Sequence, residues 1–270
     1  MTGGVRREVV FAALFGLFVL YLALPVVGMA LFSVSDGWID TVLPTRYTAD
    51  YWVAALTDPL FGPTFGRAIL ASLATIALSL LLLTPTVYLL HVAAPALRPF
   101  VEAVSLAPFA LPTVVFALAL IRTYSVPPLV LTGSPALLVL SYTVISLPFA
   151  YRAVDNAFRA LDTKRLYEAA QTLGASSWQP LVTVILPNVR RGLAAAALLI
   201  LASTFNEYTL SAFLVGDAWQ TSGVWMYKLW DDHPHETLAL GVLSFGVTWL
   251  LSIGILAVLG RGGRQGAVRA

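Results

Sequence analysis

The chain has 270 residues, of which 59% are hydrophobic and 11% are charged. An ordinary soluble domain is about half apolar and about a quarter charged, so this composition excludes a typical soluble fold. The formal net charge of +2 is small, and we attribute it to membrane topology and expect no nucleic-acid binding. The absence of cysteine excludes disulfides and thiolate metal sites.

A membrane-spanning helix needs about 20 predominantly apolar residues. Runs of this length predict an all-α integral membrane protein with about six transmembrane helices, forming one domain over residues 1–270. The expected spans are residues 9–32, 68–94, 101–121, 134–151, 193–215 and 237–259. These runs are continuously apolar and do not alternate with period two, which favours helices over a barrel.

The basic residues are unevenly divided between the predicted loops. Lys and Arg accumulate in short loops that remain in the cytoplasm. If the N-terminus lies in the cytoplasm, most of the basic residues of this chain fall in cytoplasmic segments. The cytoplasmic set comprises Arg6, Arg7, Arg98, Arg152, Arg159, Lys164, Arg165, Arg190, Arg191, Arg261, Arg264 and Arg269. With an even number of spans, both termini are therefore expected in the cytoplasm.

The three histidines offer weak candidates for sites. His233 and His235 flank a proline in an acidic outer segment, where an external metal site is one interpretation. A solvated acidic turn explains the same residues, and we expect no metal. His91 lies near the inner end of the second span, and we expect it at the membrane interface.

The cytoplasmic segment of residues 152–192 has the pattern of two short helices joined by a turn. Asp162 or Thr163 is expected to cap the first helix. Gly174 fits the position after a helix, where a left-handed conformation costs glycine least. A second amphipathic stretch is expected to end at Pro187, because proline cannot donate to a continuing helix.

This segment carries Glu168-Ala169-Ala170, then Gly174, then Leu186-Pro187. The pattern resembles the EAA loop of the MetI-like permeases of binding-protein-dependent ABC importers. Matching positions elsewhere are Leu111-Pro112, Leu147-Pro148-Phe149, Asn206-Glu207-Tyr208 and Phe213-Leu214. We refer to residues 152–192 as the coupling loop.

The resemblance implies a type I importer permease fold with cytoplasmic coupling helices, in a bacterial inner membrane. It implies that the coupling loop binds an ATP-binding subunit through Glu168, Ala169, Ala170, Leu173, Gly174, Leu186 and Pro187. The implied partners are two ATP-binding cassette subunits, a second permease that is homologous or identical, and an extracytoplasmic solute-binding protein. The chain lacks a GxxxxGK[ST] loop, so ATP and Mg are expected on the partner subunits and no cofactor on this chain.

Asn206, Glu207 and Tyr208 interrupt the fifth predicted span. Polar groups in lipid usually face a bundle interior, so these residues either join helices or line a translocation path, where Glu207 would favour a cation. The motif is more similar to the polyamine, ferric iron and thiamine permeases than to sugar permeases, which implies import of a small charged solute by alternating access. An ion-driven secondary transporter and, less favoured, a membrane-embedded hydrolase are the alternatives; no nucleophile and base are visibly paired.

Overall fold

The computed structural model describes residues 2–38 and 40–260, and the basic residues Arg261, Arg264 and Arg269 of the topology argument lie outside them. The described chain is helical, and within it the only β-pairing is an isolated bridge between Ser35 and Tyr47. It divides into two compact units. The first contains residues up to Phe61 together with Met226–Gly246, and the second contains Gly62–Trp225 together with residues from Val247 onward.

The first unit is built on the long apolar helix α1 (Thr2–Ser33), the short helix α2 (Asp50–Thr57) and the beginning of α11 (Pro234–Gly260). The indole of Trp52 in α2 donates to Ser33 Oγ at 3.1 Å. The ring of His235 in α11 stacks between the rings of Phe32 and Tyr51, and its Nδ1 lies 2.8 Å from Phe32 O. These contacts join the C-terminal end of α1 to the N-terminal ends of α2 and α11.

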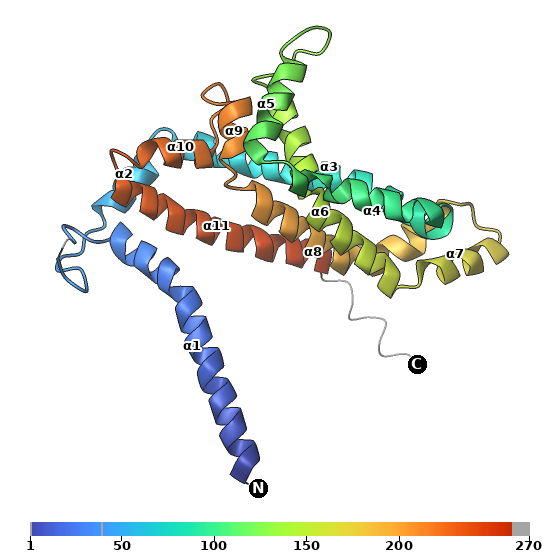
Figure 1. Ribbon diagram of the computed structural model, residues 1–270, viewed down its shortest axis with the longest axis horizontal. Coiled ribbons are helices and arrows are strands. Elements are labelled where there is room, and N and C mark those ends of the chain that lie inside the picture. Colours follow the sequence, from blue (N-terminus) through green and yellow to red (C-terminus); the bar gives the residue numbers. More distant parts are fainter. Residues whose placement is uncertain (1, 39, 261–270) are drawn as a thin grey trace. The chain divides into compact units, whose positions relative to one another are not determined.

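The second unit contains α3 (Phe61–Val92), α4 (Arg98–Leu106), α5 (Thr113–Tyr124), α6 (Pro135–Ala160), α7 (Thr163–Thr172), α8 (Leu186–Thr204) and α9 (Thr209–Leu214). The helix α10 (Ser222–Leu229) begins in this unit. α6 and α8 lie side by side in Figure 1 and make the most extensive helix pair. Small buried residues such as Ala194 and Ala197 let the backbones approach closely, as is common in membrane bundles.

Among the described residues, five helices are long and apolar enough to cross a membrane, or six if one bent pair is counted as a span. The bent pair is the predicted third span. Residues 95–110 and Thr113–Tyr124 meet at an angle of 101°, because Pro112 follows an extended Leu111 and cannot continue the preceding helix. The third predicted span therefore corresponds to a helix pair that is broken at Leu111 and Pro112.

The fifth predicted span is also different in the structure. Its apolar helix starts at Leu181, twelve residues before the predicted start, and α8 ends at Thr204. Residues 205–208 break the span, and α9 resumes at Thr209. The polar group Asn206-Glu207-Tyr208 ends the helix, so the apolar run to Val215 is not one continuous helix.

Candidate functional site

The helix α7 contains the Glu168-Ala169-Ala170 group of the coupling loop. It starts after Asp162, which adopts a left-handed conformation with φ 50°, and ends at Thr172. Gly174 has φ +81° and its amide donates to Gln171 O at 3.0 Å, so the predicted glycine-terminated helix end is confirmed. The predicted side-chain cap is wrong, because the Asp162 carboxylate pairs with Arg165 and the Thr163 hydroxyl donates to Phe158 O.

One face of α7 is exposed in the described chain, and it carries both charge and apolar surface. Glu168 is exposed, and its carboxylate lies 3.9 Å from Lys164 Nζ. Ala169 is exposed and Ala170 is half-buried. Because alanine side chains are small, the helix is narrow at these two positions. Leu173 directly follows the helix with 88% of its surface exposed. Leu173 thus presents apolar surface directly beside the exposed charged face of α7.

The coupling loop continues into α8 without the helix end predicted at Pro187. A π-helical turn (Leu181–Ile185) leads directly into α8, and the Leu186 amide donates to Leu181 O. Pro187 lies in the first turn of α8, where a missing amide proton is tolerated. Leu186 and Pro187 are exposed at this junction. Because the helical backbone is continuous here, the second predicted short helix is the beginning of the fifth span.

The C-terminal end of α3 packs against the coupling loop. Tyr88 is 1% exposed, and its hydroxyl donates to the backbone carbonyl of Ser177. Its ring lies edge-on to Tyr167 of α7, with centroids 6.2 Å apart, and 5.7 Å from the ring of Trp178. Sequence reasoning did not single out Tyr88; its only signal is a tyrosine near the end of an otherwise aliphatic span.

Asp155 is the centre of a buried charge cluster that joins α3, α4 and α6. Its carboxylate accepts hydrogen bonds from Arg98 Nη2 at 2.6 and 2.7 Å and from Arg159 Nε at 2.9 Å. His91 Nε2 lies 2.9 Å from the same carboxylate, and the His91 side chain is only 10% exposed, so it is mostly buried within the protein; its place at the membrane interface stays a prediction. The cluster was missed because residues at 91, 98 and 155 are brought together only by the fold; the Asp155–Arg159 spacing was its one local signal.

The break in the fifth span is held by polar contacts from three elements. The Glu207 carboxylate accepts hydrogen bonds from the Leu210 amide at 2.9 Å and the Ser211 amide at 3.2 Å, so it caps α9. The Tyr142 hydroxyl of α6 donates to Glu207 O, and Ser222 Oγ donates to Asn206 Oδ1 at 3.0 Å. Tyr208 is partly exposed. The structure thus brings Asn206 and Glu207 into one network, and their place on a translocation path stays a prediction.

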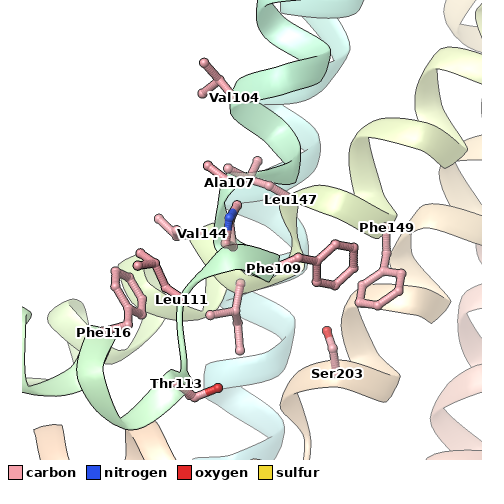
Figure 2. Close-up of a pocket in the computed structure, with 12 residues that line it drawn as sticks. Val104, Ala107, Phe109, Leu111, Thr113, Phe116, Val144, Leu147, Phe149 and Ser203 are labelled. Atoms are coloured by element: carbon pink, nitrogen blue, oxygen red, sulfur yellow. The ribbon is translucent and has the colours of Figure 1, made fainter.

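A largely apolar cavity of about 500 Å³ lies where the bent third span meets α6 and α8. Figure 2 shows its lining, in which the rings of Phe109 and Phe149 lie edge to face with centroids 5.3 Å apart. The hydroxyl-bearing residues Thr113 and Ser203 contribute to the wall. Leu111, Leu147 and Phe149, three of the residues that carry the sequence resemblance, also line this cavity.

The two outer histidines make separate contacts. His233 pairs with Glu236 at 3.2 Å, whereas His235 is held in its aromatic stack. Among the described residues there is no group of three or more His, Cys, Asp or Glu side chains that could hold a metal ion.

Residues 92–262 match the family model described as "binding-protein-dependent transport system inner membrane component". A protein of Sinorhizobium fredii named as an ABC transporter permease is 34% identical over 221 residues, which cover 77% of this chain and 37% of that relative. The chain therefore spans well under half the length of this relative.

Other relatives match over nearly their whole length. A 2-aminoethylphosphonate transport system permease of Salmonella paratyphi A is 26% identical over 92% of this chain and 93% of its own. A molybdate/tungstate transport system permease of Pyrococcus abyssi is 26% identical over 92% of both chains.

The fold is also found in a solved structure. A bacterial ABC transporter involved in the import of the acidic polysaccharide alginate matches with a TM-score of 0.72 and 19% identity, covering 97% of this chain and 98% of that one.

The family whose model matches residues 92–262 is a transport component and not an enzyme, so neither the hydrolase nor the secondary-transporter alternative describes this chain. The chain is a multi-pass membrane protein that belongs to the family of binding-protein-dependent transport system inner membrane components, as a permease subunit of an ABC importer.

Proposed function

We propose that this permease binds its ATP-binding partner through α7 and the residues that follow it. The exposed Leu173 is the single observation that carries the proposal, because it presents apolar surface directly after a helix with an exposed charged face. A short helix inserted into a groove is a common mode of protein recognition. Ala169 keeps the helix thin, and Glu168 offers a carboxylate to a basic or hydrogen-bonding partner.

The assembly follows from the family. Two ATP-binding cassette subunits, a second permease and an extracytoplasmic solute-binding protein would complete the importer, with ATP and Mg bound by the cassette subunits. The whole chain would act as one transmembrane domain in a bacterial inner membrane, with both termini in the cytoplasm. Alternating access would then depend on ligands that bind one state of the bundle more tightly than the other.

For the solute, we propose a small charged molecule that carries an oxyanion group. The named relatives transport 2-aminoethylphosphonate and molybdate or tungstate, and an Escherichia coli relative that is 30% identical over 46% of this chain is named as a sulfate permease. The carboxylate of Glu207 is occupied by the backbone amides of α9. This contact removes the main argument for a cation such as a polyamine, ferric iron or thiamine.

The first test is to purify the tagged protein from native membranes in mild detergent and to identify the co-purifying chains by mass spectrometry. We expect an ATP-binding subunit and a solute-binding protein. Thermal shifts of that binding protein with sulfate, molybdate, 2-aminoethylphosphonate, spermidine and thiamine would identify the solute class. Stabilisation by spermidine or thiamine alone would contradict the oxyanion proposal.

Reversing the charge of Glu168 tests the docking helix. Glu168→Arg should leave the chain folded and inserted but lower the recovery of the ATP-binding subunit about tenfold, because a buried charge contact at an interface is replaced by an unpaired one. Glu8→Arg makes the same change at an exposed acid of α1 and should leave recovery unchanged. Equal recovery from both variants would exclude Glu168 from the interface.

A further inference from the structure

The helix α3 contacts both the coupling loop and the break in the fifth span. At its inner end, Tyr88 is buried against Ser177, Tyr167 and Trp178. Toward its other end, Ser72 Oγ accepts a hydrogen bond from Thr204 Oγ1 at 3.1 Å. Both hydroxyls are buried, so this bond is protected from water. One continuous helix thus connects the two sites that the sequence resemblance singled out.

The aromatic contacts at the break strengthen this connection. The ring of Phe65 lies edge-on to the ring of Phe205, the first residue after α8, with centroids 6.4 Å apart. Sixteen residues separate Ser72 from Tyr88, which corresponds to about 24 Å along a helix. The helix continues through Pro85 without ending. Movement of its inner end would therefore be carried to residues 204–205.

The direct route through α8 is less regular. The π-helical turn Leu181–Ile185 lies within the coupling loop, between Trp178 and α8, and such turns are local departures from α-helical bonding that are common at functional sites. Tyr88 contacts Ser177 and Trp178, which precede this turn in the chain. The contact through α3 therefore bypasses the irregular turn.

We propose that Tyr88 is a positioning residue that transmits movement of the coupling loop to α3, and through α3 to the break in the fifth span. The inference rests on the proposed function, because it takes α7 as the element that the ATP-binding subunit moves. The Tyr88 hydroxyl holds the backbone of the coupling loop, and the ring fills the space between Tyr167 and Trp178. Movement of the coupling loop then reaches two helices. It reaches α6 through the covalent chain and α3 through the contacts of Tyr88.

The absence of cysteine makes a direct test possible. A single cysteine is introduced at Leu70 of α3 or at Leu140 of α6, two exposed apolar positions, and labelled with a bimane fluorophore. The complex with its co-purified ATP-binding subunits is placed in lipid nanodiscs. The measurements are the fluorescence change on adding MgATP and vanadate and the rate of ATP hydrolysis.

Tyr88→Phe removes the hydroxyl and keeps the ring. We expect it to reduce the Leu70 signal about fivefold, the effect of one buried hydrogen bond made in one state of the cycle, while the Leu140 signal and ATP hydrolysis are retained. Tyr151→Phe is the matched control, since Tyr151 is equally buried and its hydroxyl interacts with Arg98 of α4 and not with Ser177. Its Leu70 signal should equal that of the unsubstituted chain.

A second variant changes a partner of Tyr88 in the coupling loop. Trp178 is about half exposed, so Trp178→Leu should be tolerated by the fold and should also reduce the Leu70 signal. An unchanged Leu70 signal in both variants, or an equal loss in Tyr151→Phe, would overturn the role of Tyr88. Failure of the proposed function is distinguishable, because neither the Leu70 nor the Leu140 label would then respond to MgATP and vanadate in the unsubstituted chain.

Discussion

Glu207 is a residue whose local contacts change the interpretation of its charge. Its carboxylate accepts two backbone amides at the start of α9, which is the geometry of a helix cap. A carboxylate used in this way does not need a cationic solute nearby to explain its position in an apolar span.

Two substitutions separate the capping role of Glu207 from an electrostatic one. Glu207→Gln keeps an acceptor oxygen and should retain most transport, whereas Glu207→Ala should lose about 1 kcal/mol of stability, the usual value of a cap. Solute uptake in proteoliposomes and thermal unfolding measure the two effects. If Glu207→Gln abolishes uptake as completely as Glu207→Ala without loss of stability, the negative charge of Glu207 itself acts on the solute.

Gly192 lies where α6 and α8 approach each other closely. A Cβ at this position would collide with the side chain of Ala157. Gly192→Ala should therefore cost about 1–3 kcal/mol, the range for overpacking a tight core, and lower the unfolding temperature followed by tryptophan fluorescence.

The matched control for Gly192 lies in α11. A Cβ at Gly254 meets no atom within 4 Å. Gly254→Ala should be neutral or stabilise the helix by about 0.5–1 kcal/mol, because alanine loses less conformational entropy in a helix than glycine. Equal unfolding temperatures for the two variants would show that the α6–α8 approach is looser than the structure indicates.

At the scale of elements, the Asp155 cluster fastens α3 and α4 to α6. Removal of one partner from a buried ion pair is strongly destabilising, because it leaves other charges buried without compensation. Asp155 has a side chain only 5% exposed and faces Arg98, Arg159 and His91.

Asp155→Asn should therefore cost about 3 kcal/mol and lower the yield of folded protein in membranes. Asp36→Asn is the control, because the Asp36–Arg46 pair is exposed and spans 3.6 Å, and exposed pairs contribute about 0–1 kcal/mol. Size-exclusion chromatography and thermal unfolding in detergent measure both. Similar losses in the two variants would contradict the special role of the buried cluster.

For the whole molecule, the topology can be tested with single cysteines. Val42→Cys lies in the first outer segment and Ser176→Cys in the coupling loop, and both residues are exposed in the described chain. A membrane-impermeant maleimide should label Val42→Cys in spheroplasts and label Ser176→Cys only after lysis, because the basic coupling loop stays inside. The reverse labelling pattern would show that the chain has the opposite orientation in the membrane.

The elements that the sequence predicted well are those with strong local signals. The spans now seen as α1, α3, α6 and α11 were recognised because each contains a long apolar run. The end of α7 at Gly174 was predicted because glycine adopts φ +81° at low cost. Their exact bounds were missed by several residues, since apolar composition does not show where a helix extends beyond the hydrocarbon region.

The elements whose form the sequence left open or predicted incorrectly depend on contacts between distant residues. The break at 205–208 is stabilised by Tyr142 and Ser222, and the helix through Pro187 is made possible by a preceding π turn. Proline and polar residues indicated irregular backbone at these positions, but they did not show which neighbours would satisfy its hydrogen bonds.

The sequence by itself determined that this chain is a helical membrane protein and which loop resembles a coupling element, and it predicts that the basic loops lie in the cytoplasm. Composition, charge distribution and a spaced motif are local properties, and the hydrophobic effect and glycine geometry act on them directly. Only the tertiary structure decided that Asp155 gathers two arginines and a histidine, that Glu207 caps α9, and that Tyr88 touches the coupling loop. These contacts join residues far apart in the chain, so they form only when helix packing brings their side chains together.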